Sequence, residues 1–168
     1  AMEIYGRPYI KTAAGYIFGE PVSRNLQQQL EAADALTGTN IAPFKQLIID
    51  NVPVKLGKIN EILQNTPFKV SFRVQNELVL YLSTLIDENK PEDNKVVESL
   101  IDKATLVILL EKILPRVQGD EKLLGDTLKH LKEHVETNFI DHKDSDVYQE
   151  VIAKLTQMSN RLDSAYFA

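Results

Sequence analysis

Two histidines on one predicted helix are the first residues whose spacing could support chemistry. Residues 130–134 read HLKEH, which fits the pattern H-x-x-E-H, where both imidazoles lie on one helix face and can hold a metal ion. A metallohydrolase would also need the glutamate as its base and a third ligand from another helix. Carboxylates of the C-terminal helix could supply that ligand, but nothing singles one out. A charged helix flank carrying His130 and His134 is the plainer interpretation, so we predict no metal site.

Other catalytic signatures fail at one or more positions. Gly57-Lys58 resembles the end of a phosphate-binding loop, but G-x-x-x-x-G-K-[ST] would need a glycine at Val52 and a hydroxyl at Ile59. The sequence holds no G-x-G-x-x-G or G-x-S-x-G pattern, and it has no cysteine to act as a nucleophile. Paired carboxylates such as Asp87 and Glu88 fall at predicted helix ends, where acidic side chains are normally solvated. We therefore expect no catalytic site in this chain alone.

For an arginine and a basic turn, a purely structural role is a less complete explanation. Arg73 stands at the entry to a predicted helix, between Phe72 and Val74, where an arginine can project from the first turn. A purely structural interpretation pairs it with Glu77, four residues on, at about 0.2–0.5 kcal/mol. The second feature is the segment KILPRVQG at 112–119, for which a helix stop followed by a turn is the simplest explanation.

Together these two segments resemble the C-terminal region of McrB-like AAA+ NTPases, the motor subunits of modified-cytosine restriction systems and their relatives. The matching segments are FRVQNE at 72–77, followed by YL at 81–82, and EKILPRVQG at 111–119. The family pattern has an aromatic-Arg-Val-x-Asn/Asp-Glu helix start, a Lys-x-Leu-Pro-Arg/Lys-x-x-Gly turn and a closing helix. The residues that echo the closing helix are Lys154, Met158, Arg161, Ser164, Tyr166 and Phe167. The resemblance covers about residues 54–168.

The resemblance implies that this region is a helical lid that follows a nucleotide-binding core. In AAA+ proteins an arginine at the start of a lid helix, the sensor-2 position, approaches the nucleotide phosphates, and Arg73 matches it. A guanidinium group suits phosphate oxygens and can couple the nucleotide state to the lid angle. Lys112, Pro115, Arg116 and Gly119 match the family's turn, and we assign them no role beyond structure.

The resemblance also implies partners that lie outside this sequence. Walker A and Walker B segments do not occur here, so the chain alone should neither bind nucleotide tightly nor hydrolyse it; ATP or GTP with magnesium would bind in a full-length parent. The implied partners are the AAA+ core of the same polypeptide or of neighbouring subunits and a McrC-like nuclease, with DNA contacted only indirectly. The chain would be an excised lid or a truncated relative. A different class of function is a stand-alone helical module that binds a protein through an exposed apolar stripe.

The composition fits one globular domain of a reducing compartment. At 168 residues, with 43% hydrophobic and 26% charged side chains, the chain can bury a core without disulfides. The absence of cysteine suits the cytoplasm. A net charge of −5 disfavours a nucleic-acid-binding face, which normally needs excess positive charge. The longest apolar stretch, residues 104–110, is too short to cross a bilayer, so we expect no membrane contact.

A mainly α fold must position these residues. Residues 1–20 mix β-forming residues with glycines, which predicts a short β-hairpin-like element, and residues 21–168 predict a bundle of about six helices. Residues 106–110 are apolar all round, which is typical of a helix in the middle of a bundle. Residues 68–72 alternate like a short strand or an extended entry. The predicted helices cover about residues 24–36, 43–50, 53–65, 73–87 and 94–114, with two more starting near 120 and 146.

Overall fold

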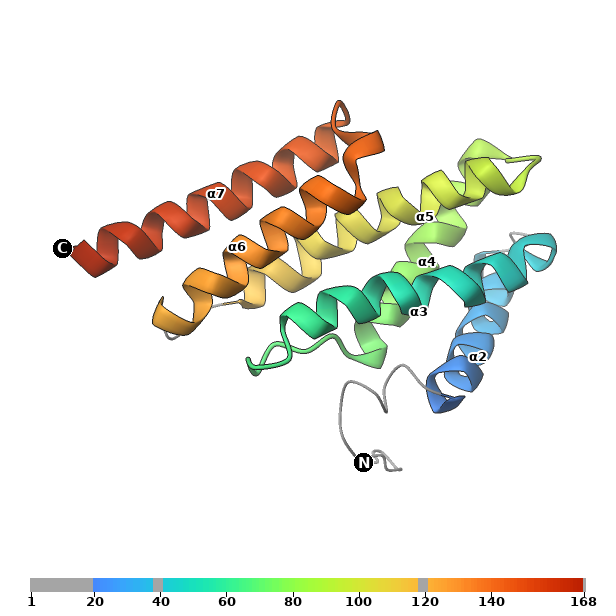
Figure 1. Cartoon of the computed structure of the whole chain (residues 1–168). Coiled ribbons are helices and arrows are strands. Elements are labelled where there is room, and N and C mark those ends of the chain that lie inside the picture. The colour runs from blue at the N-terminus through green and yellow to red at the C-terminus, as the bar shows by residue number, and fades with distance from the viewer. Residues whose placement is uncertain (1–19, 38–40, 118–120, 168) are drawn as a thin grey trace.

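The computed structural model in Figure 1 describes residues 20–37, 41–117 and 121–167. For residues 20–25, 35–37, 121–123 and 162–167 it describes the backbone only. Within these ranges the chain forms six α-helices and no strand, so the mainly α prediction is confirmed. The hairpin-like element predicted for residues 1–20 falls almost entirely outside the described residues; only Glu20 is described, and it starts the first helix.

Short helical turns separate or extend the six helices. The α-helices are α2 (Glu20–Thr37), α3 (Lys45–Ile62), α4 (Phe72–Asn89), α5 (Asn94–Ile108), α6 (Glu121–Asn138) and α7 (Asp146–Phe167). The short elements are the 3-10 turns η1 (Ala42–Phe44), η3 (Leu114–Arg116) and η4 (Ile140–His142), and the π-helical turn η2 (Leu109–Ile113).

Helix α5 lies at the centre of the bundle. It contacts α3, α4 and α7, while α6 packs along α7 and α2 packs on α4. In Figure 1, the axes of α3, α5, α6 and α7 are roughly aligned, with α6 antiparallel to α5 and α7, and α2 and α4 cross them. Leu106 and Leu109 are fully buried and Ile108 nearly so, whereas Val107 and Leu110 are partly buried, so the all-apolar segment 106–110 lies largely inside the bundle, as predicted.

Helix α3 corrects the prediction of two separate helices. We expected Pro53 to start a second helix, but α3 runs through it without a break. A proline inside a helix removes one backbone hydrogen bond and costs about 3 kcal/mol. The fully buried side chains on either side of the proline form one stripe at helical spacing: Ile48, Val52, Leu56 and Ile59. Burial of such a stripe at roughly 1.5–3 kcal/mol per side chain outweighs the lost bond.

The segment before α4 is the extended entry rather than the short strand, the two forms predicted for residues 68–72, and α4 already begins at Phe72. Residues 68–70 form no strand. The buried Asn60 accepts a hydrogen bond from the Val70 N–H at 2.9 Å, which satisfies this backbone group without a neighbouring strand. Helix α2 begins at Glu20 rather than near residue 24, with Pro21 in its first turn, a position where the missing N–H of proline has no helical partner in any case.

Candidate anion-binding pocket

The two segments that carry the family resemblance meet at one place in the fold. Arg73, in the first turn of α4, lines the same hollow as Lys112 and Arg116, which follow the end of α5. The hollow has a volume of about 560 Å³, and its other lining residues are Ser71, Phe72, Val74 and Glu77. We call this site the basic pocket. Gly119 lies outside the described residues.

Three hydrogen bonds hold the first turn of α4 in place. The Ser71 hydroxyl oxygen accepts from the Val74 N–H at 3.4 Å and caps the helix. From α2, the Gln29 amide donates to the Phe72 carbonyl at 3.1 Å, and the buried Gln75 amide donates to the Gln29 side-chain oxygen at 2.9 Å. Arg73 therefore projects from a turn that is tied to a neighbouring helix.

A change of helix type positions the other two cations. Pro115 has no N–H, and its ring would collide with the Glu111 carbonyl in a continuous α-helix. The chain therefore widens to the π-helical η2, tightens to the 3-10 turn η3 and then leaves the helix. Side chains 113, 114 and 117 are buried, whereas Lys112 and Arg116 are exposed at the basic pocket.

Positive charge is in excess in the basic pocket. The Lys112 ammonium lies 3.8 Å from a carboxylate oxygen of Glu77. The pairing of Glu77 with Arg73 that the helical spacing suggested is therefore wrong. Among the residues that the structure describes, Arg73 and Arg116 form no ion pair. Three cations thus face one carboxylate, and this arrangement favours an anionic ligand.

The two histidines lie on α6, and neither lines the basic pocket. His130 is exposed, whereas His134 is partly buried in a separate hollow of about 250 Å³ beside Lys55 and Lys58. The Asn138 amide nitrogen lies 3.0 Å from His134 Nδ1 and donates to the His134 carbonyl oxygen at 3.0 Å.

Burial lowers the pKa of His134, and the charges of Lys58 and Lys55 lower it further. Within the described part of the chain, no three His, Cys, Asp or Glu side chains come together to hold a metal ion.

One partly buried network of polar and charged side chains was not predicted. The Asp102 carboxylate on α5 lies 2.6 Å from the Lys55 ammonium on α3 and 3.3 Å from Nε2 of His142 in η4. The network therefore ties three elements together. In the sequence, the only indication is that the acidic Asp102 directly follows the apolar Ile101. Its partners Lys55 and His142 lie about 40 or more residues away in the sequence, so they cannot be assigned without the fold.

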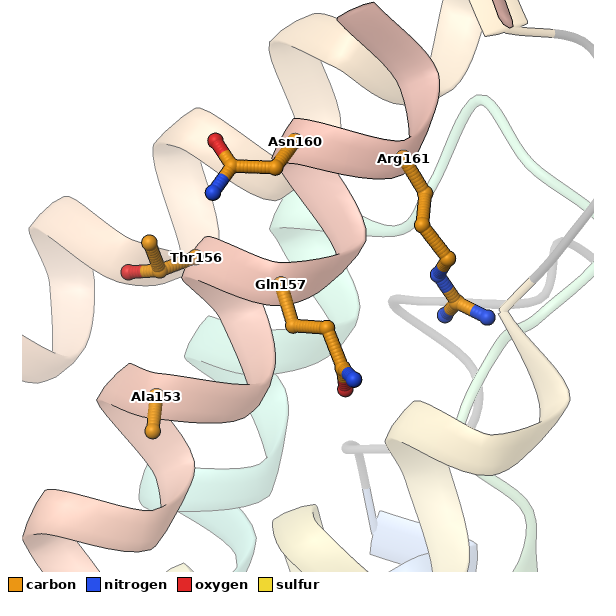
Figure 2. Close-up of a pocket in the computed structure, with 5 residues that line it drawn as sticks. All are labelled: Ala153, Thr156, Gln157, Asn160 and Arg161. Atoms are coloured by element: carbon orange, nitrogen blue, oxygen red, sulfur yellow. The ribbon is translucent and has the colours of Figure 1, made fainter. Parts of the chain in front are cut away.

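A further open hollow lies on α7, where Arg161 and four uncharged residues line a volume of about 570 Å³. Figure 2 shows Gln157 and Arg161 extending to one side, with Thr156 and Asn160 on the other. Of the family-like residues of this helix, Met158 is buried, Lys154 is partly buried and Arg161 is exposed. The side chains of Ser164, Tyr166 and Phe167 lie outside the described residues.

A family model matches residues 25–167 and has the description "Domain of unknown function (DUF8727)". The chain belongs to the DUF8727 family. The DUF8727 match begins within α2 and ends with α7, so it includes every residue of the basic pocket and both histidines of α6. No curated protein and no solved structure matches this DUF8727 chain. Among the helices described, none combines the length and apolar character needed to cross a bilayer.

Proposed function

We propose that this DUF8727 domain is the C-terminal helical lid of a McrB-like AAA+ NTPase in a cytoplasmic DNA restriction system. In this proposal Arg73 faces the phosphates of ATP or GTP held with magnesium by the AAA+ core. One observation supports it above all. The two family-like segments, about 40 residues apart in the sequence, line one pocket with three cations.

The attachment of α4 suits a part that moves as one body. The first turn of α4 is bonded to α2 through Gln29, and α4 packs against the central α5. A force on Arg73 would therefore act on the whole bundle rather than on a loop. Rigid-body lid movement of this kind can carry a change of nucleotide state to neighbouring subunits and to a McrC-like nuclease.

Nucleotide hydrolysis by the full-length parent tests the proposal. The reading frame upstream of Met2 should encode a Walker A loop, and a frame without one overturns the lid function. In the parent, Arg73→Ala should lower the hydrolysis rate by about 10- to 1000-fold, because a preorganised cation near the phosphates is lost. Lys95→Ala, at an exposed position at the start of α5 and outside the basic pocket, is the control and should leave the rate unchanged. An Arg73→Ala parent with the wild-type rate would disprove the sensor role.

The alternative function, a stand-alone module that binds a protein partner, depends on an exposed apolar stripe. Large hydrophobic side chains that are exposed within the described residues are Val54, Val96 and Ile140. They belong to α3, α5 and η4, so among the side chains that the structure describes no helix presents more than one. The basic pocket is therefore the stronger guide to function.

A further inference from the structure

We infer that the basic pocket holds the terminal phosphate of a polyphosphate chain, and that Glu77 is a built-in counter-ion which this phosphate displaces from Lys112. The inference rests on the proposed function, because a nucleotide-facing lid is what brings a polyphosphate to this surface. It also gives a role to Lys112 and Arg116, for which the family resemblance supplied none.

The net charge of the residues that line the basic pocket indicates which anion it would bind. Three cations and one carboxylate leave an excess of two positive charges, in a chain whose net charge is −5. A terminal phosphate carries about two negative charges near pH 7, whereas the phosphodiester groups of nucleic acids carry one each. Arg73 and Arg116 have no ion pair among the described residues, and guanidinium groups bind phosphate oxygens through two donors at once. A doubly charged terminal phosphate matches this site better than a phosphodiester does.

The size of the basic pocket and its backbone donors suit a polyphosphate tail. Its volume of about 560 Å³ falls within the range of roughly 300–1,000 Å³ that is usual for small-molecule sites. The pocket also includes the start of α4, and the first N–H groups of a helix have no intrahelical partner. The Val74 and Gln75 N–H groups bond to Ser71, so the N–H groups of Phe72 and Arg73 remain as neutral donors beside the three cations.

Glu77 stands where it competes with the ligand. It lies one turn after Arg73 on α4, and its carboxylate is 3.8 Å from the Lys112 ammonium. The side chains of Glu77 and Lys112 are 33% and 47% exposed, so solvent screens the pair and little holds it together. A bound phosphate would take over Lys112 and repel the Glu77 carboxylate. Neutral glutamine at this position should therefore favour binding.

Titration of the 168-residue chain with inorganic tripolyphosphate, at low ionic strength, tests the inference. We expect Glu77→Gln to bind tripolyphosphate about 3- to 10-fold more tightly than wild type, because one repulsive charge near the ligand is removed. Arg116→Ala should weaken binding by about 10-fold or more, and Lys95→Ala, at the exposed start of α5, should have no effect. Inorganic phosphate and a short single-stranded oligonucleotide should both bind more weakly than tripolyphosphate. Circular dichroism checks that each variant is folded.

Each contrary result has a defined meaning. Equal affinities of wild type and Glu77→Gln would overturn the counter-ion role. Failure of the folded wild-type chain to bind tripolyphosphate, or tighter binding of the oligonucleotide, would overturn the assignment of the ligand. The lid function is tested separately in the parent protein. A parent that needs Arg73 for hydrolysis, combined with a chain that does not bind tripolyphosphate, would leave the lid function standing and remove this inference.

Discussion

At the scale of single residues, the basic pocket depends on which charges are paired and which are left without a partner. Arg73 and Glu77 occupy positions that would favour an ion pair on an isolated helix. In the fold, Glu77 lies closer to Lys112, from a different element. The positive charge of Arg73 is therefore not neutralised by Glu77. Because Glu77 pairs with Lys112 instead of Arg73, the arginine remains available to bind an anion.

His134 should make stability depend on pH. Its pKa lies below the ordinary value of 6.5, first because of burial and then because of Lys58 and Lys55. The unfolded chain therefore takes up the proton at a higher pH than the folded chain. The contribution of His134 to the free energy of unfolding is present above pH 6.5 and is lost as the pH falls through 6.5 toward the folded-state pKa.

Urea unfolding between about pH 7.5 and 5.5, where histidine titrates, measures this effect. His134→Gln should reduce the fall in the free energy of unfolding over that range. The exposed His130 provides the control, since His130→Gln should leave the fall as it is in wild type. If His134→Gln unfolds with the wild-type pH dependence, the environment of His134 does not disfavour its charged form.

At the scale of elements, two prolines have opposite effects on their helices. Pro53 lies inside α3, and the helix continues past it, whereas Pro115 lies in the 3-10 turn that ends the helical segment after α5. Beyond Pro53 the buried stripe of α3 continues, so the packing of its apolar side chains stabilises the extended helix. Beyond Pro115 the chain leaves the helix at Val117, which is extended.

Pro53→Ala should stabilise the protein. Alanine restores a backbone donor inside α3 and has a far higher helix propensity, so the free energy of unfolding should rise by about 1–3 kcal/mol after allowance for the more flexible unfolded chain. Pro67, exposed in the loop before α4, is the matched control, and Pro67→Ala should lower stability by up to about 1 kcal/mol. Chemical denaturation measures both. A Pro53→Ala variant less stable than wild type would show that packing of the proline ring matters more than the missing bond.

At the scale of the whole molecule, α5 should contribute strongly to the stability of the fold, because it packs against α3, α4 and α7. Leu106→Ala, at a fully buried position of α5, should lower the free energy of unfolding by about 2–5 kcal/mol. Val96→Ala, on the same helix but 41% exposed, should change it by no more than about 0.5 kcal/mol. Equal effects of the two substitutions in guanidinium denaturation would contradict the central position of α5.

The mainly α class, the largely buried position of residues 106–110 and most helix ends could be predicted from the sequence alone. These features depend on local properties, namely the spacing of apolar residues and the helix stop at Pro115. It also singled out Arg73 and the turn that contains Lys112 and Arg116, because both stand at helix boundaries. Only the tertiary structure showed that the three cations share one pocket, that Glu77 faces Lys112, and that Asp102 joins Lys55 to His142. These contacts join residues about 35 to 50 positions apart, and they depend on how helices cross, which helical periodicity does not encode.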